Sequence, residues 1–203
     1  MRQFIYYSRT APTSGSYVKE DLHKSGRLDI AIHSLIAAFF LSHRIRTDVK
    51  MHLFFAGPPI TPKHLEIKPA TEGQTGEDKV YFSKRNVSKV IKKMLYKNKD
   101  GEKVEVFPGF QIETYSILPY ISSLKNQNLY ILDPKGEDIR TAKIKTNPIF
   151  ILGDQRGLPS KELKRLKSLC TPITVGPATY FASQTITIVN NELDRREVED
   201  KKT

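Results

Sequence analysis

The chain has 203 residues, a mass of 23.2 kDa and a formal net charge of +11. Hydrophobic residues make up 38% of it and charged residues 27%, which excludes a collagen-like or wholly disordered chain and predicts one globular domain over residues 1–203. A single cysteine excludes a disulfide framework and a cysteine-rich zinc site. The surplus of lysine and arginine favours a polyanionic partner such as RNA, because binding releases condensed counterions. A basic protein without such a partner is the alternative.

The N-terminus lacks the apolar core of a signal peptide, and the longest apolar run, 30–41, is too short to span a bilayer. We therefore expect a soluble protein of the reducing cytoplasm, with no membrane role.

In the first half of the chain, alternating β-forming residues predict a strand over 1–8. Apolar residues at helical spacing predict a buried helix over 27–46, and a continuous apolar run predicts a buried strand over 49–57. Short strands at 65–67 and 79–83 and a basic amphipathic helix over 86–96 follow. The next stretch, 97–109, predicts turns with little structure.

The second half predicts a helix at 114–124 and strands at 129–133, 148–154 and 171–175, with a turn at 134–138. Helices are expected at 159–169 and 180–196, before a charged tail at 197–203. Strands that alternate with helices indicate an α/β fold, with a mainly parallel sheet flanked by helices.

Three of these strands run into glycine-containing loops, LDPKGED, GDQRG and GPATYFAS. Ligands of open parallel sheets bind beyond the carboxyl ends of the strands, so the three loops predict a small-molecule pocket. Each loop taken alone is equally compatible with a plain connector. A Walker sequence and a GxGxxG motif are absent, which argues against a mononucleotide P-loop and a standard dinucleotide fold.

The segments PIFILGDQRGLP and ITVGPATYFASQTITIVNNELD resemble the C-terminal half of the SPOUT methyltransferases. GRLDIAIHSLIAAFFLSHRIRTDV resembles the N-terminal block of the archaeal tRNA pseudouridine-54 N1-methyltransferases. The resemblance implies a C-terminal trefoil knot within residues 129–196, a homodimer, tRNA as substrate and S-adenosylmethionine as cofactor. It also implies that the loops hold the cofactor through Leu132, Asp133, Leu152, Gly153, Asp154, Gly157, Val175, Pro177 and Ala182.

Methylation of pseudouridine at N1 requires the N1 proton to be accepted or held, which suits a carboxylate beside a cation. Asp29 is the candidate acceptor, Arg27 the candidate cation and His43 a further candidate acid or base. The structural alternatives are a helix-dipole charge for Asp29 and a salt bridge or phosphate contact for Arg27.

Several basic residues are candidate RNA contacts, although a solvated helix face or a helix C-terminus would explain them equally: Arg44, Arg46, Lys84, Arg85, Lys89, Lys92 and Lys93. His52 and His64 have no ligand-like spacing, so no metal site is expected, and His33 is expected in the core. Cys170 lies in apolar surroundings, which argues against a covalent cysteine mechanism.

These observations favour an enzyme that transfers methyl from S-adenosylmethionine to N1 of pseudouridine 54 in the T-loop of tRNA. The alternatives are an N1-pseudouridine methyltransferase of small-subunit ribosomal RNA, a non-catalytic RNA-binding factor with the same fold, and a ribose 2′-O-methyltransferase.

Overall fold

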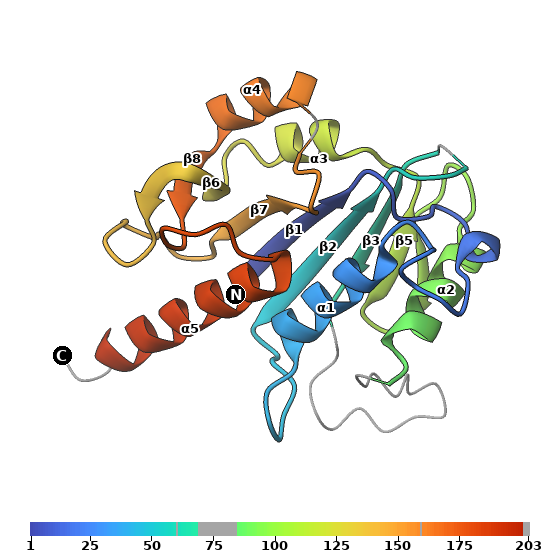
Figure 1. The fold of residues 1–203 in the computed structure, drawn as a ribbon, viewed down its shortest axis with the longest axis horizontal. Coiled ribbons are helices and arrows are strands. Elements are labelled where there is room, and N and C mark those ends of the chain that lie inside the picture. Colours follow the sequence, from blue (N-terminus) through green and yellow to red (C-terminus); the bar gives the residue numbers. More distant parts are fainter. Residues whose placement is uncertain (60, 69–84, 159, 201–203) are drawn as a thin grey trace.

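The computed structural model describes residues 1–59, 61–68, 85–158 and 160–200 (Figure 1). The strand expected at 79–83 and the candidate RNA contact Lys84 lie outside these residues. Among the described residues, no helix is long and apolar enough to cross a membrane.

The described strands form one eight-stranded sheet in the order β4-β5-β3-β2-β1-β7-β6-β8. Five neighbouring strands are parallel: β1 (Arg2–Ser8), β2 (Val49–Phe55), β6 (Leu129–Asp138), β7 (Ile149–Gly153) and β8 (Thr171–Thr174). The other three extend the sheet in antiparallel fashion: β3 (Lys63–Ile67), β4 (Val104–Phe107) and β5 (Phe110–Glu113). The predicted mainly parallel α/β architecture is therefore confirmed.

Helices cover both faces of the sheet (Figure 1). One face packs against α1 (Leu28–Phe39), α2 (Val87–Lys97) and α5 (Ala182–Asp200), and the other against α3 (Ile117–Ser123) and α4 (Ser160–Leu169). Alternate residues of β1 serve the two layers, because Phe4 and Tyr6 face α1 while Ile5 and Tyr7 face α3 and α4. A short 3-10 helix, Gly15–Tyr17, lies between β1 and α1.

Three expectations about regular structure were wrong. Helix α1 ends at Phe39, although a helix was expected over 27–46, because Phe40 is extended and pairs with Ile45 in a short bridge. Residues 104–113 form the β4–β5 hairpin, although the stretch 97–109 predicted little structure. Strand β4 is only half-buried at the edge of the sheet, so its burial alternates weakly, and Gly109, with φ of +79°, makes the turn. Helix α5 continues to Asp200 and so includes most of the tail expected to be frayed.

The strand β6 bends at the turn expected at 134–138. Leu132 and Glu137 both pair with Ile173, so the residues between them bulge out of the ladder. Gly136 sits in this bulge, where a Cβ atom would lie 2.4 Å from the backbone nitrogen of Ile173. The bulge therefore requires glycine at this position.

Arg2 fastens the start of β1 to α5. Its guanidinium is 3% exposed and contacts Asp48 at 2.8 Å and both Asp194 and Glu197 at 2.9 Å. Arg46 donates to the same Asp194, so two cations share this carboxylate at the C-terminal end of α1. Together these ion pairs hold α5 against the parallel half of the sheet.

Candidate active site

The carboxyl ends of β1, β7, β6 and β8 meet at one edge of the sheet, because these strands are adjacent and parallel. The chain leaves β1 at this edge and returns through a loop to the N-terminus of α1. The three loops predicted to hold a ligand and the Arg27–Asp29 segment therefore share one end of the fold.

The loop after β7 is built around Asp154. This carboxylate accepts a hydrogen bond from Ser8 Oγ at 2.7 Å and one from the backbone nitrogen of Arg156 at 2.8 Å. A Cβ atom on Gly153 would lie 2.5 Å from the carbonyl carbon of Gly157, so the loop folds back tightly on itself. Gly157 has φ of +70° and open space where a side chain would be, so its backbone can approach a ligand closely.

The loop after β6 is held by Asp133. Its carboxylate pairs with Lys167 of α4 and accepts a hydrogen bond from the backbone nitrogen of Lys135 at 2.9 Å. The Lys167 ammonium lowers the pKa of Asp133, so this carboxylate stays ionised. Asp133 thus connects the start of the β6 bulge to α4.

The third loop joins β8 to α5. Val175 is buried at its start, whereas Pro177 is exposed, and Phe181 is 71% exposed at its end. Gln184 accepts a hydrogen bond from the backbone nitrogen of Phe181 at 3.0 Å, which closes the first turn of the helix. The loop thus presents an aromatic side chain next to Ala182, a predicted cofactor residue.

The N-terminus of α1 has an unusual backbone. Gly26 and Arg27 both have left-handed φ angles, of +61° and +60°. A Cβ atom on Gly26 would lie 1.8 Å from the carbonyl oxygen of Thr10, and Thr10 Oγ1 donates to the carbonyl of Gly26 at 2.8 Å. Left-handed φ is strained for a side chain such as that of Arg27, and here the contacts of Thr10 hold it in place.

Arg27 and Asp29 form a two-point ion pair at this helix end. Arg27 Nε and Nη2 each donate to one oxygen of Asp29 at 3.1 Å, and both side chains remain partly exposed. Burial alone would raise the pKa of Asp29, but the hydrogen bonds from Arg27 lower it below its ordinary value. The pair therefore presents an ionised carboxylate and a cation at a helix N-terminus.

Tyr6 of β1 is an aromatic residue that could stack on a flipped base or belong to the core, and the structure buries it completely. Its hydroxyl is buried and has no hydrogen-bond partner among the described residues. Burial, followed by the charges of Asp154 and Asp29, raises its pKa. Tyr6 is therefore a neutral phenol at physiological pH.

The geometry suits a cofactor with apolar and polar parts. Apolar side chains lie on or next to three of these strands, with Leu132 half-buried and Leu152 and Val175 buried, and glycine-containing loops offer backbone groups at the same edge. Over residues 1–198 the chain matches a family described as "Putative SAM-dependent RNA methyltransferase". The chain belongs to this family of RNA methyltransferases.

Relatives match the methyltransferase over nearly its whole length. A tRNA (pseudouridine(54)-N(1))-methyltransferase of Pyrococcus abyssi is 35% identical, with 96% of this chain and 98% of the relative covered. One from Methanosarcina mazei is 33% identical, with 98% and 93% covered. A protein of Vibrio vulnificus named "Putative pseudouridine methyltransferase" is 31% identical, with 97% and 100% covered, so similar chains occur in bacteria as well as archaea.

A solved structure shows the same fold. Nep1 of Archaeoglobus fulgidus, bound to S-adenosylhomocysteine, superposes with a TM-score of 0.60 and 10% identity, covering 97% of this chain and 99% of that one. The expected SPOUT-type architecture of the methyltransferase is thereby confirmed.

The structure does not place all the candidate residues at one site. His43 follows the C-terminus of α1, a helix of twelve residues and so about 18 Å long, whereas Asp29 lies at its N-terminus. Arg46 is 9% exposed and is bound to Asp194, so it supports α5 and does not fit the role of an RNA contact. His33 was expected in the core but is exposed.

Two lysines of α2 that are candidate RNA contacts, Lys92 and Lys93, already interact with other parts of the protein. Lys92 donates to the carbonyl of Val18 at 2.9 Å, and the Lys93 ammonium lies 4.6 Å from the ring centre of Phe107. Arg85 and Lys89, like Arg44 beyond α1, are exposed and stay candidate RNA contacts.

Two polar residues have structural explanations. Cys170 is buried, which raises the pKa of its thiol to about 11 and argues against a nucleophilic role. Asn190 is 2% exposed and donates to the carbonyl groups of Ala37 and Ala38, so it joins α5 to α1.

Proposed function

We propose that this methyltransferase transfers a methyl group from S-adenosylmethionine to N1 of pseudouridine 54 in the T-loop of tRNA, in the cytoplasm. The observation that carries the proposal is the Arg27–Asp29 pair beside the three-loop edge of the sheet. Full-length relatives named for this reaction support the choice of substrate.

The three loops are the proposed cofactor site. Leu132, Leu152 and Val175 would contact the apolar parts of S-adenosylmethionine, and the backbone of residues 153–157 would bind its polar groups. When bound, the cofactor supplies an electrophilic methyl group. The tight approach of Gly153 to Gly157 explains why small residues are needed where the chain folds around a ligand.

The protein's task is to hold the uracil ring so that N1 faces the cofactor site. Asp29 accepts the N1 proton, or a hydrogen bond from the N1–H group. Arg27 stabilises the negative charge that develops on the uracil oxygens. Because Arg27 lowers the pKa of Asp29, the carboxylate is ionised at neutral pH and ready to accept. The target base must leave the T-loop stack to reach this site, and the exposed ring of Phe181 is placed to stack on it.

The functional molecule is proposed to be a homodimer. A groove of about 480 Å³ runs between α1 and α5, and half-exposed apolar side chains line it together with polar ones: Ile36, Ala37, Phe40, Thr187 and Asn191. A second copy seated here would cover these apolar atoms.

The decisive experiment uses two tRNA transcripts, one with pseudouridine and one with uridine at position 54. The protein is incubated with each and with labelled S-adenosylmethionine, and the digested nucleosides are identified by mass spectrometry. We expect N1-methylpseudouridine from the first transcript alone. Transfer to neither by folded protein that binds the cofactor would favour ribosomal RNA, a ribose-methylated product would favour 2′-O chemistry, and absence of cofactor binding would favour a non-catalytic RNA-binding factor.

A further inference from the structure

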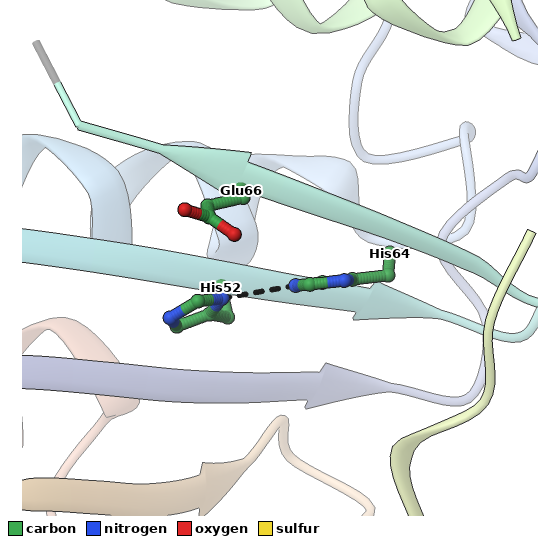
Figure 2. Close-up of side chains that lie close together, drawn as sticks. All are labelled: His52, His64 and Glu66. Atoms are coloured by element: carbon green, nitrogen blue, oxygen red, sulfur yellow. Dashed lines mark hydrogen bonds between the residues drawn. The ribbon is translucent and has the colours of Figure 1, made fainter. Parts of the chain in front are cut away.

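A cluster of metal-binding side chains lies under α3, on the sheet face opposite α1. Figure 2 shows His52, His64 and Glu66 on the neighbouring strands β2 and β3. Antiparallel pairing places His52 opposite Glu66, and alternation along β3 turns His64 to the same face. One atom from each side chain, two ring nitrogens and a carboxylate oxygen, lies within 4.8 Å of the other two. Their sequence spacing did not predict this cluster.

The outward nitrogens of both rings face oxygen acceptors. His64 Nδ1 lies 2.8 Å from Glu113 Oε1, and His52 Nε2 lies 3.1 Å from Gln3 Oε1. A carboxylate only accepts hydrogen bonds, so His64 Nδ1 carries the hydrogen, and the amide oxygen of Gln3 requires the same of His52 Nε2. In neutral imidazoles, this leaves a lone pair on each inward nitrogen.

The inward nitrogens, His52 Nδ1 and His64 Nε2, face each other at 2.9 Å (Figure 2). Two lone pairs at this distance repel, and a cation between them removes the repulsion. Metal-binding histidines in proteins usually donate their other N–H to a carboxylate or amide oxygen, as both rings do here. The hydroxyl of Tyr120 lies 3.2 Å from His52 Nδ1, so a fourth donor atom, the second oxygen, is near the same point.

We propose that His52 Nδ1, His64 Nε2 and the Glu66 carboxylate bind a divalent transition-metal ion of the zinc type. Two imidazoles and a carboxylate are a donor set that zinc accepts. Zinc–nitrogen bonds of 2.0–2.1 Å at tetrahedral angles place two nitrogens about 3.3 Å apart, so the rings need to separate by about 0.4 Å. The ion would join β2, β3 and α3, and its role is structural.

Two lysines compete with the ion for Glu66. Lys50 Nζ lies 2.7 Å from Oε1, and Lys103 Nζ lies 3.0 Å from Oε2. The Lys103 side chain is 42% exposed and can turn into solvent, which frees Oε2 for the ion. The competition yields a sharp test, because removing the Lys103 charge must tighten metal binding if Glu66 is a ligand.

The experiment titrates the chelator-treated full-length protein with Co²⁺ and then Zn²⁺, followed by visible absorption and calorimetry. We expect one equivalent of Co²⁺ to give visible bands that Zn²⁺ removes, and zinc to raise the thermal unfolding midpoint. His64→Gln and Glu66→Gln should abolish the bands, Glu113→Gln should weaken binding about 10–100-fold, and Lys103→Gln should tighten it. His33→Gln, which changes an exposed histidine, is the matched control.

A wild-type protein without saturable Co²⁺ bands overturns the proposal, as do bands that persist in both His64→Gln and Glu66→Gln. The pair is then a metal-free hydrogen-bonded relay, in which the Gln3 amide turns its NH₂ group toward His52. If His64→Gln does not fold, Glu66→Gln and Lys103→Gln decide, because opposite changes in affinity support the site and equal affinities exclude it.

Discussion

Asp29 and Arg27 divide the electrostatic task at the N-terminus of α1. Burial raises the pKa of this carboxylate, but the two hydrogen bonds and the positive charge of Arg27 together lower it below its ordinary value. An ionised acceptor suits proton removal from N1, but the same ion pair makes Asp29 a weaker base. In the proposed mechanism, the reaction therefore depends on how Arg27 divides its hydrogen bonds between Asp29 and the substrate.

Replacing Asp29 with Asn should lower kcat about 10²–10⁴-fold and leave S-adenosylmethionine affinity unchanged, because only the proton acceptor is lost. Single-turnover methylation and calorimetry measure the two quantities, with the exposed Asp21→Asn as control. Near-normal kcat with a lowered unfolding midpoint would leave Asp29 only its helix-dipole role.

Arg27→Gln tests the pH dependence. Without the hydrogen bonds from Arg27, burial dominates and raises the pKa of Asp29, so the carboxylate becomes protonated at higher pH. The acid limb of the kcat/KM profile, which reports ionisation in the free enzyme, should shift to higher pH. An unshifted acid limb would show that Asp29 does not control the reaction.

At the scale of elements, the bulge of β6 shapes the cofactor edge. Asp133 holds it through Lys167 and Lys135, and Gly136 permits the close approach of Ile173. The bulge turns the chain out of the ladder at the position where a ligand-binding loop is needed.

Gly136→Ala should destabilise the protein by about 1–3 kcal/mol, because the added Cβ meets backbone that cannot move away as a flexible side chain would. Urea unfolding measures this change, and calorimetry should show weaker S-adenosylmethionine binding. Gly101→Ala is the control: that residue has φ of +80° but open space, so it loses only about 1–2 kcal/mol of backbone conformational energy and keeps its cofactor affinity. Unchanged affinity in Gly136→Ala would separate the bulge from the cofactor site.

At the scale of the whole molecule, the groove between α1 and α5 predicts where two copies meet. Thr187→Glu places a charge on an exposed position of this groove, so it should convert a homodimer to monomers and reduce methyl transfer. Light scattering after gel filtration measures the oligomeric state, with Gln127→Glu, which adds the same charge at an exposed position after α3, as control. A wild-type monomer, or a dimer that survives the substitution, would contradict this interface.

The resemblance also implies a trefoil knot within residues 129–196, which stays a prediction. Hydrophobic patterning describes which segments become strands and helices, and it is silent on whether one segment passes through a loop formed by another.

The sequence by itself determined the α/β class, most element positions and the three glycine-containing loops, because periodicity and glycine placement act locally. It also placed Arg27 and Asp29 together, since they are two residues apart. The sequence did not predict the β4–β5 hairpin, because the edge strand β4 is buried too little for buried and exposed residues to alternate clearly.

Only the tertiary structure decided the contacts that depend on register and helix packing. Antiparallel pairing of β2 with β3 brings His52 beside Glu66, and packing of α5 on α1 takes Arg46 into an ion pair with Asp194. Each of these outcomes depends on residues distant in the chain, and side-chain chemistry alone does not specify which distant residues will meet.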